Sequence, residues 1–520
     1  MKTIKSIASA VRLNIMEGIL VTLAFVFFLL TIKQGHDWGD DFAQYISHGK
    51  NIAEGTPYKN TGYIFNSYSW WIGPQTYPPV FPFLLSTVYV IYGLNLNAMR
   101  IMILICYLLF LITFVLYCKK ILQSDIARIS ALLMVAFSPL HWDIKNSVIS
   151  EIPFLMFFYF GLLLSDKIET LQQQGHKAIV AAIAFGVVCY LAYGTRSVGL
   201  FLIVAYFISQ LYNRRGNSSA VYCPAFLFVI LFVLQDIGLH TDKSYIDSME
   251  KLGYEHPSGN ATNYLDNLYQ YGLFFLNNIT RNLVLYMKEI KWYWESGSNG
   301  VIAGIVAMAT GLLCGLGFIR IIKVSVSTGD VFFVAYFLFL LAAPFFQGTR
   351  YLLPIFPLYA IYIFKAFDYK LQQRDVTVKK FTNMVAIAVI ASIYVVNYFK
   401  VDYSPYKYGI GTQASKEMFD YIKNDTPRDS LIIFQKPRAM ALLGERKSSS
   451  YHYGYGKKLD ATKIEKFLRD IKATHIVISK GVWGEEEWDL YVKWVKSENT
   501  FLVEKYHNSD FSVYGIRAYN

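Results

Sequence analysis

The sequence contains little charge and little cysteine for its length of 520 residues. Charged residues make up 17% of it, and its five cysteines all lie in or beside apolar runs. With no cysteine in the polar C-terminal part of the chain, a disulfide framework or a Cys-x-x-Cys metal site is excluded. We do not expect a cleavable signal peptide, because the first apolar run is long enough to span a membrane. Internal repeats and low-complexity tracts are also absent from the sequence.

Apolar and aromatic residues are abundant instead. Hydrophobic residues form 54% and aromatic residues 17% of the chain, and the mean hydropathy is +0.32. Soluble domains of average composition carry more charge. The net charge of +12 could indicate nucleic-acid binding, but basic cytoplasmic loops of a membrane protein explain it better. The composition therefore predicts a polytopic membrane protein with a soluble part attached and without a nucleic-acid partner.

Eleven apolar runs are candidates for membrane-spanning helices. They lie at about 14–33, 101–118, 126–140, 152–165, 178–194, 197–212, 220–237, 299–320, 329–346, 350–367 and 381–399. A further short run, 80–92, begins with prolines. If it lies on the membrane surface, the basic loops all fall on the cytoplasmic side, as the positive-inside rule requires. We therefore expect a mainly α bundle of about 11 transmembrane helices, with the N-terminus inside and the C-terminus outside.

This topology places four segments on the outer face. They are a long first loop (34–100), a short second loop (138–153), a third loop (238–298) and the C-terminal region (400–520). The last alternates helix-like stretches such as ASKEMFDYIKND with strand-like stretches such as THIVIS, which predicts a small α/β domain. We divide the chain into a transmembrane domain (1–399) and an extracytoplasmic domain (400–520), and we favour packing or acceptor docking as the role of the latter.

Two adjacent carboxylates, Asp40 and Asp41, follow the first apolar run in WGDDFAQYISHGK. They precede a stretch with helical spacing, so an ordinary helix N-cap is one interpretation. The other is a general base at the membrane surface, partly shielded from water. On this motif alone the two interpretations have equal weight.

Glu151 lies at the outer end of another apolar run, in SVISEIPFLMF. A carboxylate so close to hydrocarbon is costly unless it is paired or used. A salt bridge with Lys145 explains it as well as a role in a site does.

The triplet Gly-Thr-Arg occurs twice, in YGTRSVG (Arg196) and QGTRYLLP (Arg350), and both arginines lie at the outer ends of expected spans. Snorkelling at the membrane edge would account for each of them singly. Two arginines on the same side as the carboxylates indicate a bound anion instead. The planar guanidinium suits phosphate, because it makes paired charged hydrogen bonds.

The order of these motifs resembles that of GT-C glycosyltransferases, in particular the protein O-mannosyltransferase and aminoarabinose-transferase-like group. Over residues 10–400 a first span is followed by the acidic exit motif, the Pro-Pro helix start YPPVFPF, an acid before Ile-Pro, TRSVG and RYLLP. The resemblance implies an enzyme that moves one sugar, with inversion, from a polyprenyl-phosphate carrier to a hydroxyl of a lipid, glycan or protein. It also implies action on the outer face of a membrane, which we expect to be a bacterial inner membrane.

The resemblance assigns roles to the acidic motif. The family pattern is Asp-Glu-x-x-Tyr with the first aspartate as base, so the spacing to Tyr45 selects Asp41, and Asp40 is the alternative. Phe42 stands where the family has its glutamate. Tyr77 stands where relatives often have His or Lys, so the expected basic group near the base is missing or comes from elsewhere.

The remaining roles also follow from the resemblance. Arg196 and Arg350 are expected to bind the donor phosphate. Site-supporting or sugar-binding roles fall to Glu151, Tyr45 and Tyr351. Lys50 and Lys59 are candidates for the missing basic group.

No cofactor is expected to be required, because a monophosphate donor needs no metal clamp. A divalent metal is the less favoured alternative, since its possible ligands lack metal-like spacing: His36, Asp37, His48 and His141. Two other functions remain open. A transporter or flippase would also have many spans, but its charges would lie near the bilayer midplane in paired repeats. An oligosaccharide ligase or polymerase would use a lipid-diphosphate donor, and a bound metal would favour it.

Overall fold

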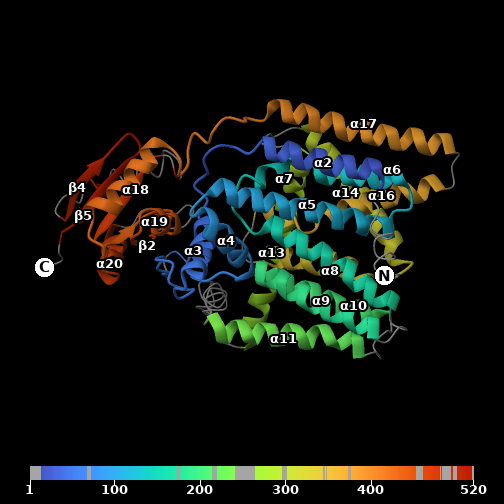
Figure 1. The fold of residues 1–520 in the computed structure, drawn as a ribbon, viewed down its shortest axis with the longest axis horizontal. Coiled ribbons are helices and arrows are strands. Elements are labelled where there is room, and N and C mark those ends of the chain that lie inside the picture. Colours follow the sequence, from blue (N-terminus) through green and yellow to red (C-terminus); the bar gives the residue numbers. More distant parts are fainter. Residues whose placement is uncertain are drawn as a thin grey trace.

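The computed structural model describes most of the chain. The described residues are 13–66, 72–171, 176–213, 219–239, 264–294, 301–343, 348–372, 376–451, 461–480 and 501–517, with Ser69, Phe346, Val482, Trp494 and Val495. Long helices make up one part of the molecule, and a small sheet with its helices lies at the other end (Figure 1). The expected combination of a mainly helical bundle with a C-terminal α/β part is thereby confirmed.

Each apolar run expected to span the membrane coincides with a helix. These helices are α2 (Ile15–Leu30), α5 (Leu96–Ile121), α6 (Asp125–Ala136), α8 (Glu151–Leu171), α9 (His176–Thr195), α10 (Leu200–Tyr212), α11 (Ser219–Leu239), α14 (Val301–Ile322), α15 (Thr328–Ala342), α16 (Phe356–Gln372) and α17 (Val376–Lys400). Capping boxes start two of them, through Asn14 with Glu17 and through Ser327 with Asp330. Such reciprocal bonds satisfy backbone donors that the first turn leaves free.

Four helices within the described residues are long and apolar enough to cross a membrane by length and composition. They cover Leu96–Ile121, His176–Thr195, Ala220–Leu239 and Gly304–Ile322. Six further apolar helices have only 10 to 17 residues within the described part of the chain. The expected number of about 11 spans is therefore not confirmed, although the helices themselves are present.

The segments expected to form the outer loops also contain helices. The first loop folds into α3 (Asp41–Glu54) and α4 (Val80–Tyr92), the second into α7 (Pro139–Ile144), and the third contains α13 (Tyr264–Glu289) and the 3-10 turn η5 (Ile290–Tyr293). Residues 240–263 of the third loop lie outside the described residues. Two more 3-10 turns, η3 (Ser197–Gly199) and η6 (Thr349–Leu352), follow α9 and α15.

The helices α3 and α4 pack closely because Gly49 has no side chain. A Cβ at this position would lie 3.0 Å from the carbonyl oxygen of Pro82 and 3.2 Å from the Cβ of Leu85. Glycine therefore sets the distance between the two helices. Their contact fixes α3, and with it the acidic motif at its start, against the Pro-Pro helix.

Within the described residues, the C-terminal part contains a five-stranded mixed sheet and several helices. Its elements are α18 (Gln413–Asp425), β1 (Leu431–Ile433), α19 (Pro437–Leu443), β2 (Lys447–Ser449), α20 (Ala461–Asp470), β3 (His475–Ser479), β4 (Leu502–His507) and β5 (Phe511–Ile516). The strand order is β2-β1-β3-β5-β4, with β1 parallel to β2 and β3, and β5 antiparallel to β3 and β4. The sequence stretches expected to form helices and strands do so, and β2 is an additional strand.

The first outer loop is joined to this sheet along β2. The backbone N–H of Ile64 donates to Ser448 at 2.8 Å, and the N–H of Ser448 donates to Gly62 at 2.9 Å. Side chains extend the contact, since Asn66 donates to the Ser449 hydroxyl at 2.8 Å and to the Ser450 carbonyl at 2.7 Å. We call residues 62–66 with 448–450 the loop–sheet seam. The expected boundary between residues 399 and 400 stays a prediction, but the two parts share hydrogen bonds.

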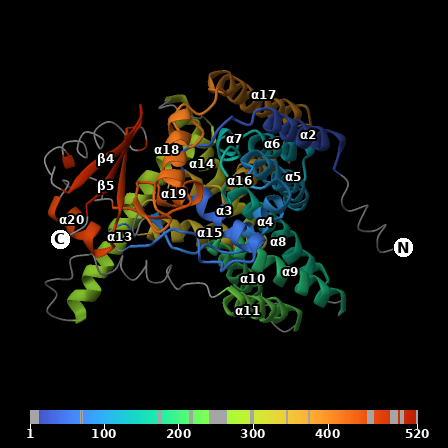
Figure 2. The ribbon, with the colours of Figure 1, turned by 60° about the vertical axis from the view of Figure 1, so that its left-hand side comes forward.

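A second contact between the loop and the C-terminal part is apolar. Trp38, just before α3, lies buried against the rings of Phe419, Phe434 and Phe511, with centroid distances of 5.6 to 5.9 Å. Both views place α19 beside α3 (Figures 1 and 2). The acidic motif therefore lies between the helical bundle and the sheet.

Candidate active site

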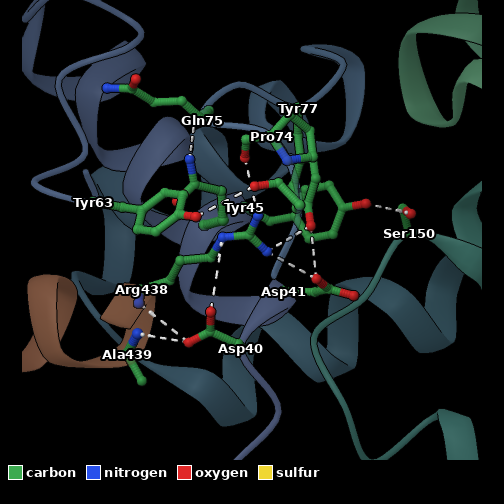
Figure 3. Close-up of polar contacts among 12 residues, drawn as sticks. Asp40, Asp41, Tyr45, Tyr63, Pro74, Gln75, Tyr77, Ser150, Arg438 and Ala439 are labelled. Carbon is green, nitrogen blue, oxygen red and sulfur yellow. Dashed lines mark hydrogen bonds and ion pairs between the residues drawn. The ribbon is translucent and has the colours of Figure 1, made fainter. Parts of the chain in front are cut away.

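Three side chains from distant parts of the chain bind the carboxylate of Asp41. Its Oδ1 accepts a hydrogen bond from the Tyr77 hydroxyl at 2.7 Å and one from Arg438 Nη1 at 3.0 Å (Figure 3). Its Oδ2 pairs with Arg350 Nη2 at 2.6 Å. Asp41 is the first residue of α3, Arg350 comes from η6, and Arg438 comes from α19. The fold thus gathers loop, bundle and C-terminal residues around one carboxylate.

Asp40 occupies the N-cap position of α3 but makes no capping hydrogen bond. Its Oδ1 instead accepts hydrogen bonds from the backbone N–H groups of Arg438 and Ala439, each at 3.2 Å (Figure 3). Its Oδ2 lies 3.8 Å from Arg438 Nε. The N-cap interpretation is therefore right for the position of Asp40, but its carboxylate binds the C-terminal part and not the first turn of α3.

A second group of charges lies on the bundle side of Asp41. Glu151 is buried and forms ion pairs with Arg196 and, at 3.7 Å, with Nε of Arg350. The guanidinium groups of both arginines lie over the ring of Tyr351, at 5.1 and 5.4 Å from its centroid. These cation–π contacts orient both arginines toward the same ring.

The expected alternative for Glu151, a salt bridge with Lys145, is wrong. Lys145 is buried, and its Nζ donates to the Thr31 carbonyl at 2.7 Å and to Asn146 Oδ1 at 3.0 Å. It therefore anchors the segment that leaves α2. The reason is that Glu151, at the start of α8, is paired with the two Gly-Thr-Arg arginines instead.

Tyr45 lies one helical turn after Asp41 and forms part of the same wall. Its hydroxyl and that of Ser150 are 2.9 Å apart, and its ring packs on those of Tyr77 and Phe81 at 4.7 and 4.9 Å between centroids. Residues i and i+4 of a helix share a face. The Asp-x-x-x-Tyr spacing of the sequence thus corresponds to one surface of α3.

His48 positions the backbone at Tyr77. Its Nδ1 lies 2.8 Å from the Tyr58 carbonyl, and its Nε2 accepts from the Tyr77 N–H at 3.3 Å. Burial lowers the pKa of His48 to about 3, so the ring is neutral and both nitrogens are used. Within the described residues, His, Cys, Asp and Glu side chains form no group of three or more that could hold a metal ion. Metal independence stays a prediction.

The charges at the site determine the ionisation of the two aspartates. Burial raises the pKa of Asp41, but Arg350 and Arg438 outweigh that effect and hold the pKa well below its usual range. Burial also dominates at Asp40, and it raises the pKa of that carboxyl despite the nearby Arg438. Asp41 is therefore ionised at neutral pH. Its acidity also makes it a weak base for as long as both arginines contact it.

Two cavities meet at the Asp41–Arg350 pair. The larger has a volume of about 560 Å³ and is also lined by Asp40, Asp143 and Lys436. The smaller, of about 60 Å³, is lined by Asp41 and Arg350 together with Tyr45, Tyr77, Glu151, Arg196 and Tyr351. We call these the outer cavity and the inner cavity. The residues expected to be catalytic, phosphate-binding or site-supporting all line one of them, whereas Lys50 and Lys59, the candidates for the missing basic group, line neither.

The structure adds one charged residue that sequence reasoning missed, Arg438. The stretch RAMALLGE predicted only a helix, and the candidates for the missing basic group were Lys50 and Lys59. The structure instead brings the guanidinium of Arg438 to the hydroxyl of Tyr77, at 2.6 Å. The sequence signal was indirect, since tyrosine at position 77 showed that a basic group had to come from elsewhere. The catalytic roles of the expected site residues stay predictions.

Comparison with known protein families supports the expected resemblance. Residues 76–235 match the family model described as dolichyl-phosphate-mannose-protein mannosyltransferase. This match bears out the prediction of a membrane glycosyltransferase enzyme. A comparison with curated protein sequences found no match.

Solved structures show the fold. The archaeal oligosaccharyltransferase AglB from Archaeoglobus fulgidus, in complex with an inhibitory peptide and a dolichol-phosphate, aligns with 89% of this chain and 69% of its own, with a TM-score of 0.57 and 10% identity. The same organism's oligosaccharyltransferase with Zn and sulfate aligns with 96% and 73%, with a TM-score of 0.60 and 12% identity. ArnT from Cupriavidus metallidurans bound to undecaprenyl phosphate aligns with 96% and 97%, with a TM-score of 0.50 and 12% identity. The chain shares the fold of these solved structures, as the resemblance to GT-C glycosyltransferases predicted.

Proposed function

We propose that this protein transfers one sugar from a polyprenyl-phosphate carrier to a hydroxyl group of a lipid, glycan or protein acceptor. The reaction takes place at the outer face of the membrane, with inversion at the anomeric carbon. The family model that matches residues 76–235 describes a dolichyl-phosphate-mannose transferase, and the solved ArnT structure holds undecaprenyl phosphate. Both names point to a lipid-phosphate donor.

One observation carries this proposal: the paired Asp41 and Arg350 line both the inner and the outer cavity. A transferase with two substrates needs a proton acceptor facing one of them and a cation facing the leaving group of the other. The inner cavity offers two arginines, Arg196 and Arg350, and suits the donor phosphate. The larger outer cavity is then open to the acceptor.

The proposed chemistry uses the charges that face these cavities. The acceptor oxygen forms a bond to the anomeric carbon, and its proton passes to Asp41 Oδ2. The bond between the anomeric carbon and the phosphate oxygen breaks, and its electron pair stays on the phosphate. The phosphate thereby gains a second negative charge, so Arg196 and Arg350 bind it more strongly in the transition state than in the ground state.

Donor binding also makes Asp41 a better base in this mechanism. At the site, three arginines (Arg196, Arg350 and Arg438) face three carboxylates (Asp40, Asp41 and Glu151). A monoanionic donor phosphate therefore competes with a carboxylate for an arginine. Arg350 is the one to be exchanged, because its side chain is 37% exposed while that of Arg438 is fully buried. Loss of Arg350 frees Oδ2 and raises the pKa of Asp41.

An oligosaccharide ligase with a lipid-diphosphate donor is the second candidate, since the oligosaccharyltransferase structures share the fold with TM-scores of 0.57 and 0.60. It would transfer a preassembled glycan and depend on a divalent metal to balance the diphosphate. A transporter would move the carrier lipid without consuming it. Donor identity, metal dependence and carrier release separate the three functions.

The test is a transfer assay on the purified protein in detergent. Undecaprenyl-phosphate hexoses and pentoses are supplied one at a time with a cell-envelope extract as acceptor, and released undecaprenyl phosphate is measured with and without EDTA. We expect release by the wild type, unaffected by EDTA, and a loss of about 10²- to 10⁴-fold in Asp41→Asn, the range for removal of a general base. Asp425→Asn, at an exposed position of α18, is the matched control and keeps full activity.

Four results would contradict the proposal or its assignment of the base. If Asp41→Asn keeps full activity, Asp41 is not the base. If Asp40→Asn is inactive at the same time, the neighbouring carboxylate of Asp40 has that role. Release only from a diphosphate-linked glycan, abolished by EDTA, would establish the ligase. Transport of the donor without release of carrier would establish the transporter.

A further inference from the structure

We propose that Arg438, a residue of the C-terminal part, is a positioning residue of the active site that fixes the carboxylate of Asp41 for proton transfer. This inference rests on the proposed function. It makes the C-terminal part a component of the catalytic site, where the sequence suggested only packing or docking. Arg438 contacts Asp41 and does not reach the inner cavity, so it acts through the carboxylate.

The planar guanidinium of Arg438 donates several hydrogen bonds to residues of the first outer loop. Nη1 donates to Asp41 Oδ1 at 3.0 Å and to the Tyr77 hydroxyl at 2.6 Å, and Nη2 donates to the Pro74 carbonyl at 2.9 Å. The Tyr77 hydroxyl donates in turn to Asp41 Oδ1. Arg438, Tyr77 and Asp41 thus form a closed triangle of hydrogen bonds (Figure 3). Such a triangle fixes both the position and the rotation of the carboxylate.

The surroundings of Arg438 leave it little freedom. It is 1% exposed, and its guanidinium lies over the rings of Tyr63 and Tyr77, at 5.0 and 4.8 Å from their centroids. Gly73, with a φ of +100°, makes room for it, since a Cβ there would lie 2.9 Å from Nη2. The loop is therefore shaped around this side chain, and a buried charge without its partners would be costly.

The two arginines on Asp41 differ in a way that suits different tasks. Arg438 holds Oδ1 and is buried, whereas Arg350 holds Oδ2 and lines both cavities. A donor phosphate can therefore take Arg350 without disturbing Arg438. Oδ2 is then free to accept a proton while Oδ1 stays fixed, which is the arrangement that a directional base needs.

The position of Arg438 depends on how the C-terminal part docks. The helix α19 packs against α3, and the backbone N–H groups of Arg438 and Ala439 donate to Asp40. The loop–sheet seam lies on the strand that follows α19. Asp40 therefore serves to hold α19, and Asp41 receives the side chain that α19 carries.

The experiment compares Arg438→Gln and Arg438→Lys with the wild type in the undecaprenyl-phosphate-sugar assay over a range of pH. Loss of the guanidinium raises the pKa of Asp41. The acid limb of the pH–activity profile, where protonation of this base abolishes activity, therefore moves to higher pH. We expect this limb to move up by about one pH unit or more in Arg438→Gln, and less in Arg438→Lys, which keeps the charge. At neutral pH, kcat falls roughly 10- to 100-fold from misplacement of the carboxylate. Binding of undecaprenyl phosphate stays within about threefold, because the arginines of the inner cavity are intact.

Arg446→Gln is the matched control, because Arg446 is another buried arginine of the C-terminal part and bonds Thr426 and Lys423, not Asp41. Carbodiimide labelling at pH 5, read by mass spectrometry, gives a measure that needs no activity, since it modifies protonated carboxyls. We expect more labelling of Asp41 in Arg438→Gln than in Arg446→Gln or the wild type. An acid limb that moves equally in Arg438→Gln and Arg446→Gln, or equal labelling of Asp41 in all proteins, overturns the role of Arg438. A wild type that releases no carrier overturns the proposed function instead, and the labelling still decides whether Arg438 governs Asp41.

Discussion

At the scale of single residues, the Asp41–Arg350 pair is the main support for the proposed function, but it also opposes the proposed chemistry. A carboxylate held by two arginines is ionised but weakly basic, and an arginine held by a carboxylate binds phosphate less well. The ion pair therefore lowers both the basicity of Asp41 and the affinity of Arg350 for phosphate. Removal of one should therefore strengthen the partner's own interaction.

This gives a prediction for the binding of undecaprenyl phosphate, measured without turnover. Asp41→Asn should bind it about 3- to 10-fold more tightly than the wild type, because loss of a partly exposed ion pair of about 1 kcal/mol releases Arg350. Asp40→Asn is the control, since it removes the neighbouring charge but not the partner of Arg350. In an Arg350→Gln background the gain from Asp41→Asn should vanish. Equal tightening in both single variants would point to general electrostatics and contradict the exchange.

At the scale of elements, the α3–α4 contact connects packing to the acidic motif. Gly49→Val places side-chain atoms where even a Cβ would lie 3.0 Å from the Pro82 carbonyl, so the helices must separate. We expect a loss of stability of about 1 to 3 kcal/mol, as for other overpacked contacts, seen as a lower midpoint of thermal unfolding. Gly18→Val in α2 is the matched control, because nothing lies within 4 Å of its Cβ. Similar losses in the two variants would mean that the contact at Gly49 is not tight.

Elements with a strong local signal could be predicted from the sequence. Apolar runs such as 178–194 became helices, and the alternating stretch THIVIS became a strand, because the pattern of each reports its own burial. The strand β2 could not be predicted, since Lys-Ser-Ser has no apolar alternation and pairs through its backbone with β1 and the first loop. Its place in the sheet depends on a partner far away in the chain.

The site divides in the same way. Asp41, Glu151 and the two Gly-Thr-Arg arginines stand in local motifs, and the structure brings them together. Arg438 stands in no motif, and its role depends on a contact between residues 397 positions apart. Position 77 showed only that a basic group was missing there. Arg438 supplies this group because the C-terminal part docks on the first loop. A contact between such distant residues leaves no periodic pattern in a single sequence.

At the scale of the whole molecule, the topology predicts which residues can be reached from outside a cell. The five native cysteines are buried or half-buried, so they give little background to a membrane-impermeant maleimide. Asp425→Cys in the C-terminal part should be labelled in intact cells, because we expect that part to be extracytoplasmic. Lys323→Cys, after α14, should be labelled only once the membrane is permeabilised. The opposite pattern would invert the topology and move the site to the cytoplasmic face.

The loop–sheet seam has a consequence for how this architecture can change over time. An edge strand such as β2 normally needs protection against pairing with other chains, and here residues 62–64 supply it. A C-terminal part borrowed from a relative would bring its own edge and its own arginine, but it would meet a loop shaped for different partners. The two segments should therefore be inherited as a matched pair, and functional chimaeras should require the exchange of both together.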